Sequence, residues 1–328
     1  MPVRNIEREL QLLKESCDAG SPETRARELR KALNDKVNVI VAKAATLIGE
    51  LGMRNCIPDL CSTFERLLIQ PRKTDPQCWG KTAIAKALKT LEHDDSAIFR
   101  KGAQHVQLEP VWGGEEDTAA TLRATCALAL LQCTDITRED KFWNIQRLLT
   151  EKSPSLRKDG AQALELLGGP EAALLLRLKA RMKEDDPIVT GQVFESLLRV
   201  EGEGAIPFVV EFLRSQNEEV REEAALSLGA SRLGAAVAAL KHALTERGVL
   251  VKSEVLLRAL GISRHEDAIQ TLVKVVQSGR QKDALGALEA LKIYRDSNDI
   301  VTNIREAVAS RSESEIEQQF ERLFAAAP

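Results

Sequence analysis

The chain has 328 residues, of which 44% are hydrophobic and 29% are charged, with 46 Lys and Arg against 49 Asp and Glu. A net charge of -3 lacks the basic excess of a protein that neutralises many phosphates, so the balance disfavours nucleic acid as a partner. The N-terminus is rich in charge, and no apolar run approaches the roughly 18 residues of a membrane span. These features predict a soluble, cytoplasmic protein.

The first predicted element is an amphipathic helix over residues 6–16, IERELQLLKES. We expect residues 1–20 to form an N-terminal helix that caps the structure that follows it, because a repeat array needs polar-faced ends.

Eight later segments share one helical pattern, whose first position falls at Ile40, Gly80, Leu122, Leu156, Val189, Val220, Lys252 and Asp283. Side chains four, five and eight residues after that position lie on one stripe of a helix. The eighth is aliphatic in every copy: Ile48, Leu88, Leu130, Leu164, Leu197, Leu228, Leu260 and Leu291. Successive first positions are 40, 42, 34, 33, 31, 32 and 31 residues apart, which is the period of a helical solenoid.

A second set of helices is predicted between these segments, over residues 57–68, 98–106, 142–149, 172–182, 206–213, 237–244, 269–276 and 300–308. Gly and Pro clusters such as GGP at 168–170 stand where a helix pair must turn, and no strand-like alternation is found between the helices. The sequence therefore predicts an all-α, α-α superhelix of about eight stacked helix pairs over residues 21–311.

Residues 220–244, VREEAALSLGASRLGAAVAALKHAL, resemble the HEAT-like repeats first associated with phycobilisome lyases, as do residues 39–52 and 155–169. The Leu-Gly-x-Ser-Arg of residues 228–232 also returns at 260–264. The resemblance implies a HEAT-like solenoid, a fold that serves scaffolds, chaperones, lyases and nucleic-acid enzymes alike. Lys252 and Asp283 depart from the apolar first position, so we expect the last two repeats to be offset or frayed.

The resemblance also implies that the second helix of each pair lines a concave groove. Its polar positions include Lys86, Lys89, Lys158, Glu165, Glu195, Glu222, Glu254, Arg258, Glu289 and Lys292. This face is mixed in charge and becomes acidic toward the middle. It is either a solvated surface or an acidic groove for a basic segment of another protein.

Two intervals are stretched by inserted segments, QPRKTDPQCWG at 70–80 and QLEPVWGGEEDT at 107–118. Both fall between the first and second helix of a pair, and insertions of this kind often map to binding surfaces. Arg72, Lys73, Trp79 and Trp112 are the candidate partner contacts, since Trp and Arg are favoured interface anchors. The second segment adds acidic residues beside a flexible Gly113–Gly114 pair. Trp79 could equally pack over the first turn of its own helix.

No catalytic residue, metal ligand or cofactor is predicted. The six cysteines form no C-x-x-C pair, although Cys126 and Cys133 share a helix face. HEAT-type di-iron hydroxylases acting on deoxyhypusine carry several His-Glu dyads, whereas this chain has His265–Glu266 alone. A Gly-rich phosphate loop, an H-E-x-x-H helix and a nucleophile elbow are absent from the sequence.

The last predicted element is an amphipathic helix over residues 313–324, in which Ile316, Phe320, Leu323 and Phe324 share one stripe. Residues 312–328 are thus a C-terminal capping helix and tail, or a helix offered to a partner's groove.

Taken together, these features predict a non-enzymatic scaffold or adaptor that binds a protein through its groove and N-terminal edge loops. The alternative is a HEAT-like enzyme, similar to a bilin lyase or a base-excising DNA glycosylase, with a cleft for a small ligand or nucleic acid.

Overall fold

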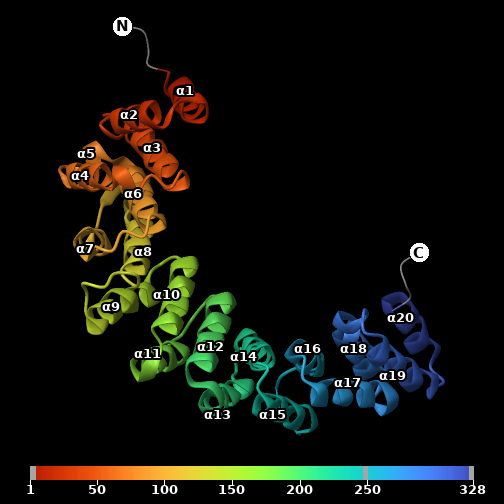
Figure 1. Ribbon diagram of the computed structural model, residues 1–328. Helices are drawn as coiled ribbons and strands as arrows, with labels where there is room; N and C mark the ends of the chain where they lie inside the picture. Colours follow the sequence, from red (N-terminus) through yellow and green to blue (C-terminus); the bar gives the residue numbers. More distant parts are fainter. Residues whose placement is uncertain (1–4, 247–249, 325–328) are drawn as a thin grey trace. The chain divides into compact units, whose positions relative to one another are not determined.

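The computed structural model describes residues 5–246 and 250–324 and is built almost wholly from helices (Figure 1). Its internal contacts divide the chain into two compact units, Met1–Ala163 and Leu164–Pro328. The all-α helical solenoid predicted from the repeat is confirmed, since helices pack in successive pairs along each unit.

In the first unit, the second helices of three pairs pack in succession, α3 on α6 and α6 on α8, while α2, α4 and α7 cover one side of them (Figure 1). The bounds are α1 (Ile6–Ala19), α2 (Pro22–Leu33), α3 (Asn38–Glu50), α4 (Ile57–Leu68), α5 (Pro71–Thr74), α6 (Trp79–Thr90), α7 (Ser96–Gln104), β1 (Leu108–Val111), β2 (Gly114–Asp117), α8 (Ala120–Ala129) and α9 (Arg138–Ile145). Helix α10 (Pro154–Leu167) runs across the division between the units. Helix α2 was not among the predicted elements, although Ser21 before Pro22 is a typical helix start.

The second unit consists of two layers. Helices α12, α14, α16, α18 and α20 pack in sequence, and α13, α15, α17 and α19 form the other layer. The bounds are α11 (Gly169–Arg181), α12 (Pro187–Glu201), α13 (Ile206–Glu211), α14 (Glu218–Ala230), α15 (Gly234–Thr245), α16 (Ser253–Ser263), α17 (Glu266–Ser278), α18 (Gln281–Leu291), α19 (Asn298–Ala309) and α20 (Ser314–Phe324).

The core consists of the positions that the repeat identified. The eight aliphatic side chains at the eighth position are all completely buried. The residues at the fifth position, which are Ala45, Ala85, Ala127, Ala161, Phe194, Ala225, Leu257 and Leu288, are at most 2% exposed. Small residues there let neighbouring helices approach, while the aliphatic side chain fills the space between them.

The expected offset of the last two repeats is wrong, because α16 and α18 are regular helices with buried stripes. Lys252 is the N-cap of α16, and Asp283 lies in the first turn of α18. A polar residue is tolerated at such an end, and the Asp283 carboxylate accepts a hydrogen bond from Ser253 Oγ at 2.6 Å.

The repeated Leu-Gly-x-Ser-Arg motif forms the end of a second helix. In the first copy Leu228 is buried, and a Cβ added to Gly229 would lie 2.2 Å from the carbonyl oxygen of Ala259 on the next helix. Ser231 Oγ donates to the Leu228 carbonyl at 2.6 Å, and Arg232 takes the left-handed conformation that ends the helix. The motif therefore encodes both a close helix crossing and a helix stop.

Both terminal helices pack on the repeats beside them, α1 on α2 and α3, and α20 on α18 and α19. The stripe of α20 predicted to be apolar, Ile316 to Phe324, is at most 9% exposed. In this arrangement the stripe covers the end of the helix stack and is not available to a partner.

All six cysteines precede residue 134, and the structure has each of them as a free thiol. Cys61 is half-buried and the other five are buried. Burial raises the pKa of Cys78 and of Cys133 to about 11, and raises that of Cys126 further. These thiols are protonated at neutral pH and behave as small apolar side chains.

Candidate binding site in the first unit

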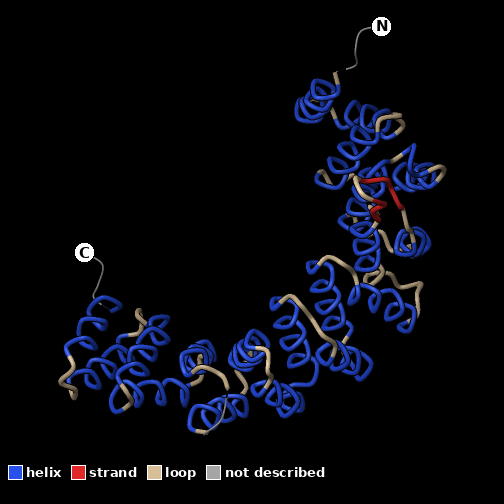
Figure 2. Tube along the Cα trace, turned by 180° about the vertical axis from the view of Figure 1, so that it is seen from behind, coloured by secondary structure: helices blue, strands red, loops and turns tan. Residues whose placement is uncertain are grey.

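The two inserted segments form ordered structure beside α6 and α8. Residues 108–117 form an antiparallel hairpin, in which Leu108 pairs with Asp117 and Val111 with Gly114 (Figure 2, red). The prediction that no strand lies between the helices is wrong at this place. Gly113 has a φ of 93° at the turn, a value that glycine adopts freely, so the Gly pair belongs to a tight turn rather than to a flexible loop.

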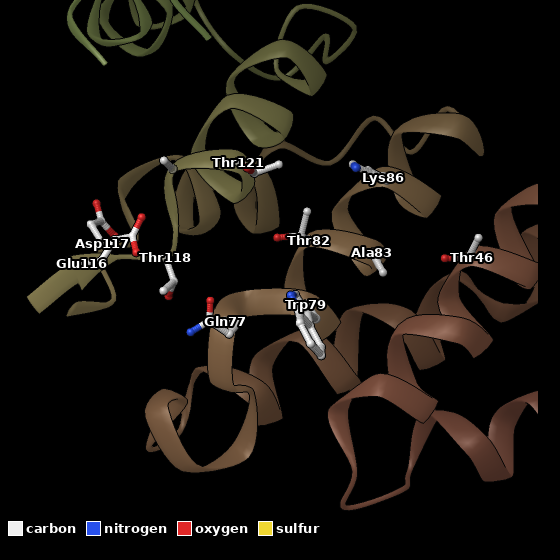
Figure 3. Close-up of a pocket in the computed structure, with 11 residues that line it drawn as sticks. Thr46, Gln77, Trp79, Thr82, Ala83, Lys86, Glu116, Asp117, Thr118 and Thr121 are labelled. Atoms are coloured by element: carbon white, nitrogen blue, oxygen red, sulfur yellow. The ribbon is translucent and has the colours of Figure 1, made fainter. Parts of the chain in front are cut away.

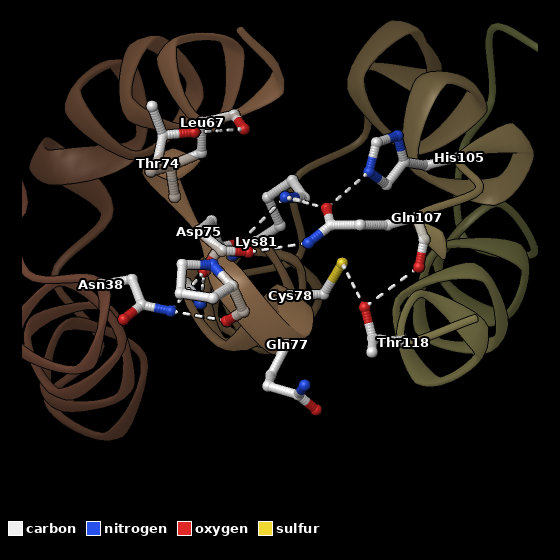
Figure 4. A network of polar contacts seen from close by, with 12 residues as sticks. Asn38, Leu67, Thr74, Asp75, Gln77, Cys78, Lys81, His105, Gln107 and Thr118 are labelled. Carbon is white, nitrogen blue, oxygen red and sulfur yellow. Dashed lines mark hydrogen bonds and ion pairs between the residues drawn. The ribbon is translucent and has the colours of Figure 1, made fainter. Parts of the chain in front are cut away.

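A buried ion pair between Asp75 and Lys81 fixes the first insert to α6 (Figure 4). Both side chains are completely buried, with Lys81 Nζ 3.0 Å from Asp75 Oδ2. The same carboxylate accepts from the backbone N–H of Gly80 at 2.7 Å and of Lys81 at 2.9 Å, which satisfies donors at the start of the helix. Lys81 also donates to Gln107 Oε1 at 3.0 Å. Because an unpaired buried charge is costly, this pairing ties both inserts to one helix.

Glu109 of strand β1 joins the hairpin to the first insert. Its carboxylate accepts from the backbone N–H of Gln77 at 2.7 Å, from Gln77 Nε2 at 3.0 Å and from Thr118 Oγ1 at 3.1 Å, and Gln107 Nε2 donates to it as well. Burial acts to raise the pKa of Glu109, but these hydrogen bonds outweigh burial and hold that pKa below its usual range. The buried carboxylate is therefore ionised at neutral pH.

Asp117 at the end of β2 is held by a second network. Arg123 on α8 donates to Asp117 Oδ2 at 2.6 Å and to Glu151 Oε1 at 2.8 Å. Burial acts to raise the pKa of Asp117, whereas hydrogen bonds from the backbone of Gln107 and Ala119, together with Arg123, lower it overall. An ionised carboxylate on each strand, Glu109 on β1 and Asp117 on β2, thus holds the base of the hairpin in place.

The inserts and the second helices enclose a pocket of about 590 Å³ (Figure 3). It is lined by Thr46, Gln77, Trp79, Thr82, Ala83, Lys86, Glu116, Asp117, Thr118, Ala120 and Thr121. Most of these groups are hydroxyls, amides or charges, and the indole of Trp79 is the aromatic surface among them. A pocket of this size and polarity suits a peptide segment or a small polar ligand.

The structure brings part of the predicted loop site together. Trp79 is 55% exposed and lines the pocket together with Thr82 and Ala83 of its own helix. Trp112 is fully exposed at the hairpin turn, away from the pocket lining. Arg72 Nη2 lies 3.6 Å from Glu115 Oε1, which joins α5 to the hairpin, and Lys73 beside it is exposed.

The four remaining candidate residues, Glu195, Glu222, Glu254 and Arg258, lie in the second unit and do not contribute to the pocket. Three of them, Glu195, Glu222 and Arg258, act electrostatically on Glu223 of α14, which the sequence analysis did not select. Burial raises the pKa of Glu223, and the charge of Glu195 raises it further, while Arg258 opposes the rise. A crowded acidic face is present here, and it belongs to a separate unit from the inserted loops.

Sequence reasoning missed the residues that hold the site, namely Asp75, Gln77, Lys81, Gln107, Glu109, Thr118 and Arg123. One signal was available, because Lys81 and Arg123 occupy the same position of the repeat, one residue after its first position. The other residues are brought together by hydrogen bonds between positions 26 to 40 residues apart in the sequence, at or beside the two inserts. The sequence carries no periodic signal for such contacts.

Comparison with known proteins supports the repeat. Residues 174–257, which lie wholly within the second unit, match the family model of HEAT repeats. The chain is thus an all-α solenoid in which residues 174–257 are similar to HEAT repeats. No curated protein matches it.

Several solved structures are similar to the chain at low identity. The E. coli protein YibA is 18% identical over 95% of this chain and 100% of its own, with a TM-score of 0.47. Human deoxyhypusine hydroxylase in complex with glycerol is 20% identical over 81% of this chain and 93% of its own, with a TM-score of 0.31.

Within residues 5–246 and 250–324, no cluster of three His, Cys, Asp or Glu side chains is placed to hold a metal ion. Among the helices in these ranges, none has both the length and the apolar character needed to cross a membrane.

Proposed function

We propose that this chain is a non-enzymatic HEAT-type adaptor, with repeats of the phycobilisome-lyase type, that binds a protein partner through the inserted loops of its first unit. The observation that carries the proposal is Trp112, fully exposed at the turn of a hairpin whose strands are held by ionised, hydrogen-bonded carboxylates. A large aromatic side chain exposed on an ordered support is typical of an interface anchor, because little conformational entropy is lost when it is buried.

The position of Trp112 favours a protein over a small ligand. A side chain on a protruding turn cannot enclose a small molecule, but it can enter a pocket on another protein. Trp79 and the ion-paired Arg72 lie on the same inserts and extend the surface that such a partner would cover.

One cysteine of the first unit lies beside a histidine, a pairing that can activate a nucleophilic thiol, but its surroundings favour the non-enzymatic proposal. Cys61 Sγ lies 3.8 Å from His93 Nε2. However, burial raises the pKa of Cys61, and the charges of Asp95 and Glu65 raise it further. The thiol is therefore protonated at neutral pH, whereas a catalytic cysteine needs a stabilised thiolate.

The test is affinity capture from native lysate with the full chain, with Trp112→Ala and with a control, Trp143→Ala, which removes another exposed indole of the first unit. We expect Trp112→Ala to weaken capture of a specific protein by about tenfold or more, since anchor residues contribute about 2 kcal/mol. The control should capture the protein normally, and all three chains should melt at the same temperature. If Trp112→Ala captures the protein as well as the control Trp143→Ala does, the result contradicts the proposal. So does the absence of a captured protein together with a small ligand that raises the melting temperature, because that result favours an enzyme.

A further inference from the structure

The pocket of the first unit has a separation of charge along its length. Figure 3 shows Glu116 and Asp117 of the hairpin at one end and Lys86 of α6 toward the other, with the Trp79 ring at the lower edge of the space between them. Both Glu116 and Lys86 are exposed, and the structure gives neither of them an ion pair in the part of the chain that it describes.

The hairpin end carries more acidic charge than its cations neutralise. Glu109 lies behind the wall formed by Gln77 and Thr118, which both line the pocket and both donate to its carboxylate. These donors are neutral, so the charge of Glu109 is not cancelled. Asp117 shares its single guanidinium, that of Arg123, with the carboxylate of Glu151.

Two further cations of this region are already engaged. Lys81 is buried against Asp75, and Arg72 pairs with Glu115. Glu116, Glu109 and the shared Asp117 therefore produce a negative potential at this end of the pocket, which favours a cation on the ligand and opposes a phosphate backbone.

The indole of Trp79 gives the cation a second interaction. It is 55% exposed within the pocket lining, so the face of the ring can contact the aliphatic stem of a long basic side chain or its charged end. The hydroxyls of Thr82 and Thr121 follow along the pocket toward Lys86 (Figure 3). Such groups can bond to the N–H and C=O groups of a main chain, and Lys86 can bond to a carbonyl or carboxylate oxygen.

From this arrangement we infer that the pocket receives an extended segment of the partner protein that carries a Lys or Arg side chain, with the cation between Trp79 and Glu116. The main chain of the segment runs past Thr82 and Thr121 toward Lys86. This inference rests on the proposed function and names the chemistry that the partner must present beside Trp112.

The experiment measures binding of four compounds to the full chain by tryptophan fluorescence and by calorimetry. They are the blocked pentapeptides Ac-AARAA-amide, Ac-AAKAA-amide and Ac-AAEAA-amide, together with free spermidine. We expect the two basic peptides to bind and the acidic peptide not to bind. Comparable binding of the acidic peptide overturns the inference, and tighter binding of spermidine overturns its assignment to a peptide segment.

Two substitutions place the site. Glu116→Gln should weaken the basic peptides at least about threefold, as expected for an exposed ion pair, and Trp79→Ala should weaken them about tenfold. The matched control, Glu139→Gln, removes an exposed carboxylate from α9 and should leave peptide binding unchanged. Equal binding by Glu116→Gln and the unsubstituted chain contradicts the inference.

The two proposals fail in different ways. If a protein is captured through Trp112 but the basic peptides do not bind, the adaptor function stands and only the inference of a basic segment is contradicted. Glu116-dependent peptide binding without Trp112-dependent capture supports the pocket and contradicts the hairpin as an anchor.

Discussion

Several second helices carry a cation one residue after the first position of the repeat, and this cation ties its helix to the segment that precedes it. Arg221 Nη1 donates to the carbonyls of Ser215 and Gln216 at 2.8 and 3.1 Å. Arg157 does the same with Glu151 and Lys152 at 2.9 and 2.8 Å. These bonds satisfy carbonyls left without partners where the preceding segment ends.

The same position has a different role beside the inserts. Arg123 keeps one such bond, to the His105 carbonyl at 3.1 Å, and adds the Asp117 carboxylate. Lys81 bonds instead to Asp75 and Gln107. A position that stabilises the repeat elsewhere has thus become part of the support for the hairpin and the pocket.

Glu109→Gln should destabilise the first unit. Four donors point at this carboxylate, whereas an amide offers one oxygen and directs its own N–H₂ toward a donor. Leaving buried donors unsatisfied costs roughly 1–3 kcal/mol. Urea unfolding of the full chain at pH 7 measures the loss, and Glu139→Gln is the exposed control. An unchanged midpoint would show that the hairpin does not depend on this network.

The same variant tests the pH dependence. The pKa of Glu109 is lower in the folded chain than its usual value, so the unfolded chain binds the extra proton first as the pH falls. The ionised Glu109 makes its full contribution to the free energy of unfolding above its ordinary pKa, near pH 4.3. This contribution is lost as the pH falls through the lower pKa of the folded chain. Glu109→Gln should therefore lose less stability than the unsubstituted chain between pH 5 and pH 3. Parallel losses would contradict this assignment.

At the scale of the element, the second helices show why glycine recurs after the buried Leu. Gly229 faces the Ala259 carbonyl, and Gly261 faces the Ala290 carbonyl, where an added Cβ would lie only 2.6 Å from the oxygen. Each crossing is therefore set by backbone against backbone, and the neighbouring helix must move if a side chain is added.

Gly229→Ala should destabilise the second unit by about 1–3 kcal/mol, the typical cost of overpacking. Gly204→Ala is the matched control, because no atom lies within 4 Å of its added Cβ and its φ is not in the left-handed region. Thermal unfolding of both variants measures the difference. Similar melting temperatures for the two would mean that helices α14 and α16 can separate at little cost.

The helices could be predicted and the hairpin could not, for a physical reason. Eight copies of one spacing indicate the buried positions, because every second helix meets the same neighbours. The strand Leu108–Val111 is four residues long and contains Pro110, so its own sequence does not favour a strand. It is stabilised by Gln77 and Thr118, which lie 32 residues before and 9 residues after Glu109. In the candidate site, Trp79 and Trp112 could be selected by residue type, but the network behind them depends on contacts between distant segments.

At the scale of the whole molecule, each repeat contacts chiefly its neighbours, so a local change should remain local. Gly229→Ala is expected to reduce amide protection in α14 and α16 while leaving α3 and α6 unchanged. Hydrogen exchange followed by mass spectrometry tests this directly. Loss of protection spread evenly over both units would instead show that the chain unfolds as one cooperative body.

The cysteines have a consequence for how such unfolding can be observed. All six precede residue 134, within the first unit, and none follows it. At the five buried cysteines, a thiol reagent added to the native chain reacts only when a repeat opens, since burial keeps these groups covered and protonated. The half-buried Cys61 is partly accessible in the native chain, so its reaction is measured separately. The rate at which the buried thiols are modified therefore reports how often the unit that holds the hairpin and the pocket opens. A bound partner that stabilises this unit will lower the rate of thiol modification, so binding can be detected before the partner's contact surface is known.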